Sequence, residues 1–180
     1  MRGILFRTMI LVALVIGGCG SQGAADGWGD GGDWTATDPF RPVTLRVHPL
    51  THIDPARAGD KGLIILHFEL KDRFGDAVKA LGTLRIELDK PGGGATPGME
   101  TQELTWDIAE LAEPQGNADR FDPATRTYRV VLAAPRWVTE WASLPPAQRK
   151  DAPAWLRLRA VMKLAGEGQT MLEDDYVIQG

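Results

Sequence analysis

Hydrophobic and polar residues alternate along most of the chain from residue 43 onwards. In 155–164 most apolar residues occupy even positions, whereas Arg157, Arg159 and Lys163 occupy odd positions. A period of two predicts a strand with one buried and one solvated face. Seven runs show this pattern, at residues 43–50, 63–71, 81–88, 101–106, 127–133, 155–164 and 169–179. Because glycine, proline and aspartate clusters separate them, the pattern predicts an all-β fold, a single antiparallel β-sandwich of about seven strands.

Helical patterns are scarce in the same sequence. Residues 136–144 place Trp137 and Trp141 four positions apart, which predicts a short helix ended by the proline pair that follows. A further helical turn is expected within 107–112. Helix is therefore expected only in connections between strands.

The first 18 residues have the parts of an export signal. Arg2 and Arg7 supply positive charge, residues 9–16 are apolar, and small residues follow. The apolar stretch is too short to span a bilayer, which takes about 20 residues. We therefore expect residues 1–18 to be a signal peptide that is removed on export.

The end of this signal has a distinctive order of residues. Ile16-Gly17-Gly18-Cys19 is an aliphatic residue, two small residues and the only cysteine of the chain. It resembles the lipobox of bacterial lipoproteins. The resemblance implies that Cys19 begins the mature chain and carries a covalent lipid, so that the membrane is a partner through this anchor. In that family an aspartate after the cysteine marks inner-membrane retention. Since Gly20 stands there, the resemblance implies a lipid-anchored protein of the bacterial cell envelope, with the outer membrane favoured.

Residues 19–38 join the lipidated cysteine to the strand-rich region, which we place at 39–180. They are rich in glycine, with Asp26, Asp30 and Asp33 interspersed, a composition typical of a flexible tether. The spacing of the aspartates is loop-like, but the bidentate glutamate of a calcium loop is missing, so a solvated tether is favoured. The tether also contains Trp28 and Trp34, for which docking on the domain, contact with lipid headgroups and simple solvation all remain open.

One segment resembles a known type of domain. Within residues 71–88, Lys71-Asp72 ends a strand, and a turn follows that Gly75 closes in a left-handed conformation. Together with Val78 and Gly82, these residues resemble part of the immunoglobulin-like modules of bacterial surface adhesins, although Asp76-Ala77 replaces the Asn-Pro usual there. The resemblance implies an immunoglobulin-like sandwich and transfers no function.

Charge argues against one class of partner. The formal net charge of −4 becomes −6 once Arg2 and Arg7 are removed with the signal, and no basic tract is present. Nucleic-acid binding needs clustered lysine and arginine. We therefore expect no nucleic-acid partner.

Motifs for catalysis are missing from the sequence. Ser21 and Ser143 are the only serines, and neither lies in the Gly-x-Ser-x-Gly elbow of a nucleophile. With Cys19 lipidated, no thiolate remains. Paired carboxylates for glycoside hydrolysis leave no sequence signature, but a chain of this length offers little room for a cleft around them. We expect no enzymatic activity, and no cofactor other than the lipid.

The three histidines raise the question of a metal site. His48 and His52 lie close together, and His67 occupies an outward-facing position of the next strand. Imidazole is a common zinc ligand, and Asp54 could join the histidines. The first two lie across a strand end, however, where they need not converge. We expect exposed histidines without a metal.

The tryptophans supply the candidate binding residues. Trp106 and Trp155 fall in strand phase and are expected in the core, as tryptophan often is in sandwiches. Trp137 and Trp141 lie outside the strands and could stack on a carbohydrate or small ligand. The sequence thus predicts non-catalytic binding or a structural role. The expected contact is with an envelope protein, through a strand edge or the Trp137/Trp141 segment, and the alternative is a glycan or small ligand at the two tryptophans.

Overall fold

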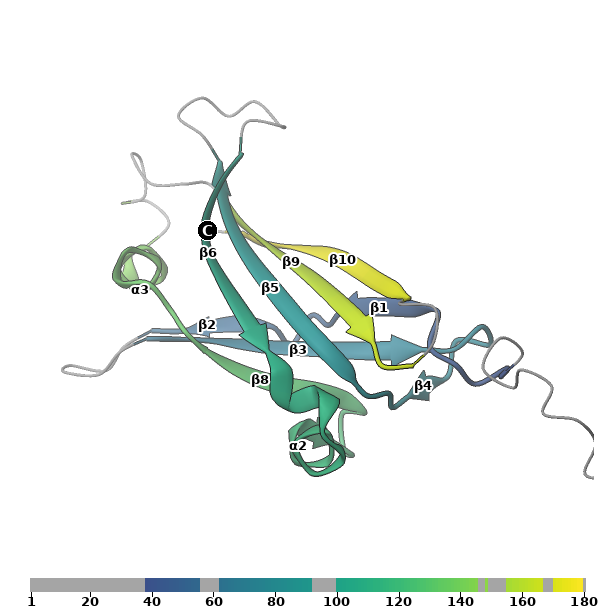
Figure 1. Ribbon diagram of the computed structural model, residues 1–180. Coiled ribbons are helices and arrows are strands. Elements are labelled where there is room, and N and C mark those ends of the chain that lie inside the picture. Colours follow the sequence, from purple (N-terminus) through teal and green to yellow (C-terminus); the bar gives the residue numbers. More distant parts are fainter. Residues whose placement is uncertain are drawn as a thin grey trace, which may run out of the picture. The chain divides into compact units, whose positions relative to one another are not determined.

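The computed structural model describes residues 38–55, 62–91, 100–145, 148, 155–166 and 170–179, all within one compact unit. Over these residues ten strands form two antiparallel sheets that pack as a sandwich (Figure 1). The first sheet has the order β1 (Thr44–Val47), β3 (Leu63–Lys71), β8 (Thr127–Ala133), β7 (Phe121–Asp122), and β2 (His52–Asp54) and β4 (Ala77–Val78) also pair with β3. The second has the order β10 (Met171–Gln179), β9 (Trp155–Leu164), β5 (Gly82–Pro91), β6 (Glu100–Ile108).

This strand order confirms the immunoglobulin-like prediction. Immunoglobulin domains pair strands A, B, E and D in one sheet and G, F and C in the other, and some add C′ beside C. Taking β1 as A and following the chain, the two sheets here read A-B-E-D and G-F-C-C′. Ten strands replace the expected seven because β2, β4 and β7 have only two or three residues each, too few to show a period of two.

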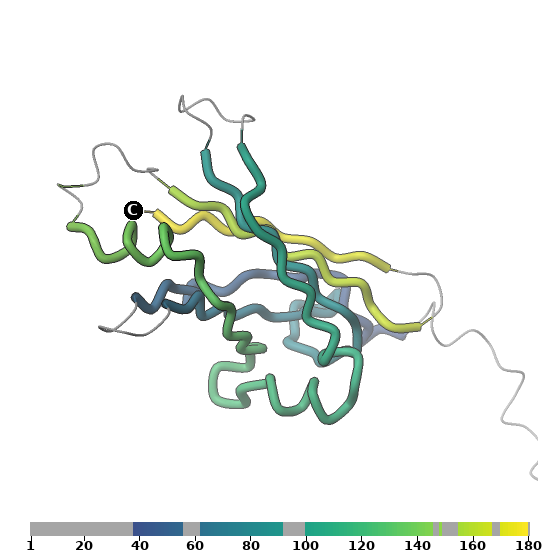
Figure 2. Tube along the Cα trace, turned by 60° about the vertical axis from the view of Figure 1, so that its left-hand side comes forward, coloured from purple at the N-terminus to yellow at the C-terminus, as the bar shows by residue number. Residues whose placement is uncertain are grey.

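The predicted elements lie close to the observed ones. The bounds of β3, β8 and β9 are those that the alternation predicts, and α3 (Arg136–Ser143) and the 3-10 turn η1 (Ala109–Ala112) occupy the expected helical segments. Helix α2 (Pro114–Arg120) was not expected, because its sequence PQGNADR has no apolar residue at helical spacing. Figure 2 shows α2 and α3 as separate coils outside the strands.

The core is the layer between the two sheets. Phe68 and Tyr128 face each other in register across β3 and β8, with ring centroids 4.9 Å apart. Other inner-face side chains at most 3% exposed are Leu45, Val47, Ile64, Leu66, Leu70, Leu84, Ile86, Leu88, Val130, Leu132, Leu156, Leu158, Ala160 and Met162. Fully burying one such side chain contributes about 1.5–3 kcal/mol, so this layer is the main source of stability.

Polar contacts join the two sheets at one side of the sandwich. The Val47 N–H of β1 donates to Asp174 Oδ2 of β10 at 2.7 Å. Nearby, the Arg41 guanidinium donates to the hydroxyl of Thr170, just before β10. The edge strands β1 and β10 therefore lie side by side, as Figure 1 shows.

The turn of the segment that resembles adhesin modules has the expected geometry. Gly75 has a φ of +85°, and Asp72 Oδ1 accepts the N–H groups of Phe74 at 2.9 Å and Asp76 at 3.0 Å.

Glycine is required at position 82 for a different reason. A Cβ there would lie 2.4 Å from the backbone oxygen of Lys163, so the close approach of β9 requires glycine.

Two tryptophans are less buried than expected. Trp155 shares the outer face of β9 with Arg157 and is half-buried, so the prediction that it lies in the core is wrong. The period of two itself places residue 155 outward once Leu156 is inward. Trp106, on the edge strand β6, is also only half-buried, although it packs against the core.

Helix α2 is held by a buried polar network. Asn117 is 4% exposed, and its Nδ2 donates to the backbone oxygens of Ala80 at 2.8 Å and Leu111 at 3.1 Å. Its Oδ1 accepts the Tyr128 hydroxyl at 2.9 Å, and that hydroxyl accepts the Ala80 N–H at 3.3 Å. Burial raises the pKa of Tyr128, which keeps the hydroxyl protonated as a donor.

We expect Asn117→Ala to lower the free energy of unfolding by about 2–4 kcal/mol, because it leaves buried donors and acceptors without partners. Urea denaturation followed by circular dichroism measures the change. Asp119→Ala is the matched control in the same helix, since Asp119 is exposed and its carboxylate accepts a hydrogen bond from the Gln115 side chain and from no other side chain in the described part of the chain. The control should stay within about 0.5 kcal/mol of the wild type. Equal losses in both variants would show that the network does not hold α2.

Candidate functional site

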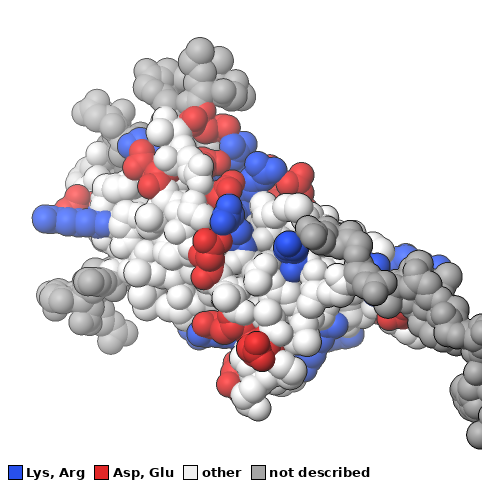
Figure 3. Space-filling view, in the orientation of Figure 1, with Lys and Arg blue, Asp and Glu red and all other residues white. Residues whose placement is uncertain are grey.

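The outer face of the sheet β10-β9-β5-β6 carries charged side chains of both signs in adjacent rows (Figure 3). In one row Glu173, Val161, Arg85 and Asp107 stand opposite one another on the four strands. This arrangement follows from the alternation, since residues directly opposite on neighbouring strands share a face. Every outward position of β9 and β5 is thereby placed on one surface.

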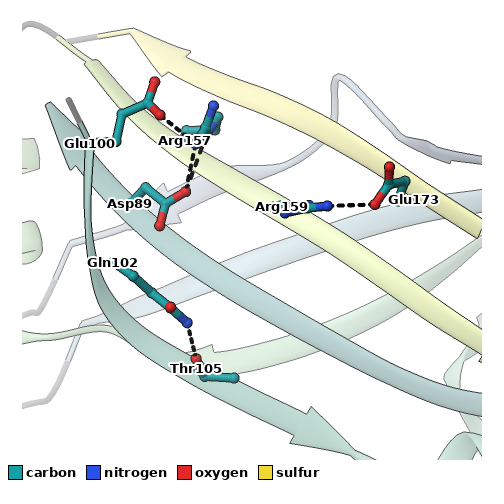
Figure 4. Close-up of polar contacts among 7 residues, drawn as sticks. All are labelled: Asp89, Glu100, Gln102, Thr105, Arg157, Arg159 and Glu173. Carbon is teal, nitrogen blue, oxygen red and sulfur yellow. Dashed lines mark hydrogen bonds and ion pairs between the residues drawn. The ribbon is translucent and has the colours of Figure 1, made fainter. Parts of the chain in front are cut away.

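Ion pairs fix most of these charges in place (Figure 4). Arg157 lies between Asp89 Oδ2 at 3.0 Å and Glu100 Oε2 at 2.6 Å, and Asp89 is only 7% exposed. Arg159 donates to Glu173 Oε2 at 2.6 Å. The Arg159–Glu173 pair is exposed, and exposed ion pairs contribute little stability, so we interpret it chiefly as orienting the two side chains.

Arg85 forms a further pair at the edge of the sheet. Its Nε donates to Asp107 Oδ1 at 2.8 Å, and this hydrogen bond raises the pKa of the Arg85 guanidinium. A hydrogen bond to Glu173 raises the pKa of Arg159 in the same way. Both guanidinium groups therefore remain charged throughout the physiological range.

An open hollow of about 360 Å³ lies in this face, toward the end of β9. Its walls include Arg85, Arg159, Glu173 and Glu87, and its apolar part includes Met171, which is 64% exposed. Lys163 also lines the hollow, is exposed, and has no ion pair among the residues that the structure describes.

This combination suits non-covalent recognition. Fixed charges of both signs can pair with charges of a partner, and the exposed methionine and the unpaired lysine can be buried by it. The hollow is open to solvent, which favours a protein surface or an extended segment over a fully enclosed small molecule.

The two tryptophans expected to bind a ligand do not form a shared surface. Trp141 is 4% exposed and belongs to the core, so its predicted role as a stacking face is wrong. Trp137 is half-buried against the core, and Lys90 Nζ lies 5.4 Å from its ring centroid. The four-residue spacing that suggested a pair also places both rings on one face of α3, and the helix packs that face inward.

His67 differs from its expected exposed position, since it is only 7% exposed. Its Nδ1 lies 3.0 Å from Thr127 Oγ1, which in turn lies 2.8 Å from Thr125 Oγ1. Thr125 donates to Asp122 Oδ2 at 2.9 Å. Because each hydroxyl has one proton, Thr127 must donate to Thr125, and His67 Nδ1 must donate to Thr127.

Electrostatics disfavour a charged imidazole at this position. Burial lowers the pKa of His67, and Arg129, His52 and His48 lower it further, while Asp122 acts in the opposite direction. Backbone and hydroxyl hydrogen bonds from Ala124 and Thr125 hold the pKa of Asp122 below its usual value. The chain of hydrogen bonds therefore runs from a neutral imidazole to an ionised carboxylate.

The remaining sequence candidates separate into two groups. Cys19, Ser21 and the aspartates of 26–33 lie outside the described residues. Ser143 lies in α3, where its hydroxyl donates to the backbone oxygen of Thr139 at 2.7 Å. Within the described part of the chain, no three His, Asp or Glu side chains gather as metal ligands would. In that same part, no helix has the length and apolarity needed to cross a membrane.

Sequence analysis missed the hollow on the outer face of the second sheet. The alternation indicated which residues face outward, but the strand order that brings Lys163, Arg85 and Met171 onto one surface is a property of the tertiary fold. Comparison with known proteins finds no matching family model and no similar curated protein.

We expect the stability of the protein to fall as the pH drops below about 6.5, the usual pKa of histidine. Because the pKa of His67 is lowered in the folded state, the unfolded chain binds a proton first as the pH falls, so acid favours unfolding. Above about pH 6.5 the imidazole is neutral in both states, and His67 does not contribute to the pH dependence of stability. Urea unfolding at pH 7.5 and 5.5 measures the change in the free energy of unfolding. Between these two pH values, His67→Gln should lose less stability than the wild type.

The control is His52→Gln, which changes an exposed neighbour and keeps the buried imidazole. It should keep most of the pH dependence. If His67→Gln and the wild type lost the same stability between the two pH values, the buried imidazole would not be the group responsible.

Proposed function

We propose that this chain is a lipid-anchored protein of the bacterial cell envelope whose immunoglobulin-like sandwich binds another protein and catalyses no reaction. The anchor is supported by the order of an apolar run, two glycines and the single cysteine, Cys19. Lipidation at this position would hold the sandwich near a membrane through residues 19–38.

The observation that carries the binding proposal is the outer face of the sheet β10-β9-β5-β6. Its hollow is lined by the exposed Met171 and by Lys163, which forms no ion pair with any residue that the structure describes, and oriented charges surround them. An exposed apolar residue beside charges of both signs matches the polar rim and apolar centre of protein interfaces.

The free strand edges are weaker candidates for the same contact. Edge strand β6 has a register shift at Glu103, whose carboxylate is 2.5 Å from Lys90 Nζ, and charged residues and irregular pairing discourage the addition of another strand. Edge strand β10 reaches toward β1 through Asp174. The outer face of the sheet β10-β9-β5-β6 is therefore the surface that we assign to the partner.

The anchor proposal predicts that Cys19→Ser abolishes labelling of the protein by fatty acid, because the serine hydroxyl cannot replace the thiol that accepts the lipid. Growth with a labelled fatty acid, followed by isolation of the protein, measures this. Ser21→Cys in the Cys19→Ser background is a control for the position of the thiol, and it should stay unlabelled. Wild-type levels of label in Cys19→Ser would contradict the anchor.

The binding proposal predicts a site-specific cross-link. A photo-reactive amino acid in place of Thr83, which lines the hollow, should cross-link the full-length protein to a partner in living cells. The same amino acid in place of Thr44, exposed on β1 of the other sheet, should not.

Adding Lys163→Glu should weaken the cross-link from position 83 about tenfold, as expected for loss and reversal of a central charge at an interface. Arg46→Glu, the matched reversal on the first sheet, should change it less than about twofold. Equal cross-linking from both sheets, or no effect of Lys163→Glu, would show that this face is not the contact surface.

A further inference from the structure

Two phenylalanine rings are exposed at the end of the sandwich where the described chain begins. Phe40 is 64% exposed and precedes β1, and Phe74 is 63% exposed in the turn between β3 and β4. Their ring centroids are 6.3 Å apart. Val43, 52% exposed, precedes β1 directly, so three apolar side chains lie in two neighbouring segments. Exposed phenylalanine in such a cluster suggests a contact surface.

Basic side chains accompany these rings. The Arg73 guanidinium lies 4.8 Å from the centroid of Phe74. Lys79 lines the same surface hollow as Phe40, and its Nζ lies 4.0 Å from the ring centroid of Phe121. Both side chains are exposed, and neither forms an ion pair among the described residues. We call Phe40, Val43, Arg73, Phe74 and Lys79 the tip.

The acids beside the tip are partly engaged. Asp38 Oδ1 accepts the Phe40 N–H at 2.9 Å, and Asp72 is 3% exposed within the turn. Asp76 is the other acid of that turn, and it is exposed. The exposed charge around the rings is therefore not dominated by acids, unlike the chain as a whole, which has a net charge of −4.

We propose that the tip docks on the surface of a phospholipid bilayer that contains anionic headgroups. This inference rests on the proposed anchor at Cys19. Phenylalanine rings insert at the boundary between headgroups and acyl chains, and lysine and arginine pair with anionic headgroups. The tip presents both kinds of side chain together.

The position of the tip favours the bilayer over other occupants. The chain enters the sandwich at Asp38, beside Phe40, so the tip is the part of the domain nearest in sequence to Cys19. The 19 residue-to-residue steps from position 19 to position 38 span at most about 65 Å when fully extended. A lipidated Cys19 would therefore keep the tip at a high effective concentration near the surface, where contacts too weak for free association suffice.

Docking of the tip would also orient the sandwich. Figures 1 and 2 show α3 and the β3–β4 turn at opposite ends of the sheets. With the turn on the membrane, the sheet β10-β9-β5-β6 would be roughly perpendicular to the membrane plane. Its outer face would then be accessible to a partner.

The test uses the full mature protein, isolated from membranes and reconstituted in vesicles of phosphatidylethanolamine and phosphatidylglycerol that contain a spin-labelled quencher lipid. An environment-sensitive thiol dye is placed through Asp76→Cys in the turn, or through Glu140→Cys on α3 as the distant control. Asp76 is exposed, and its side chain makes no hydrogen bond or ion pair with any of the described residues.

We expect the dye at position 76 to be quenched at least about threefold more strongly than the dye at position 140, because only the former enters the interfacial region. Phe40→Ser with Phe74→Ser should reduce quenching at 76 to the level at 140, while the protein stays on the vesicles. Leu104→Ser with Val177→Ser, a pair of exposed apolar residues on the second sheet, should leave it unchanged.

Two results would overturn the proposal, and they differ from failure of the anchor. Equal quenching at the two positions would show that the tip does not touch the bilayer. Quenching at position 76 that survives the double phenylalanine change would show that the rings do not cause it. Dye uptake by the unmodified protein would reveal a free Cys19 thiol, which overturns the anchor and, with it, the docking.

Discussion

The structure depends on the burial of the two apolar sheet faces against each other. Phe68 and Tyr128 from the first sheet and Leu88 and Leu158 from the second are fully buried in the layer between them. Once alternate residues are committed to this layer, the intervening residues must face outward. The charged rows on the outer face of β10-β9-β5-β6 are therefore a consequence of the same alternation that builds the core.

Much of the fold could be predicted from the sequence, because long strands with one buried face leave a period of two. The run from Leu63 to Lys71 and the run from Trp155 to Leu164 were predicted to the residue. Helix α2 could not be predicted, since Asn117 holds it through hydrogen bonds with Tyr128, 11 residues away, and Ala80, 37 residues away, and neither contact leaves a pattern within the helix sequence.

The candidate site was less predictable, because exposure depends on neighbouring strands. Trp141 looked available outside the strands, yet α3 packs it into the core, and His67 looked solvated, yet Thr127 and adjacent strands cover it. The hollow beside Lys163 is lined by residues from all four strands of the second sheet, so it forms only when these strands come together. In each case the pattern of hydrophobic and polar residues within one segment could not reveal which other segments pack against it.

We propose two functional parts in this protein. A lipidated cysteine would hold the chain at a membrane, and the sandwich would present one charged face there to a partner. The central claim is tested most directly by mass spectrometry of the N-terminal peptide of the protein isolated from its native cells. We predict a peptide that begins at Cys19 and carries the mass of attached acyl chains. A mature chain that begins at another residue, or at Cys19 with an unmodified thiol, would contradict it.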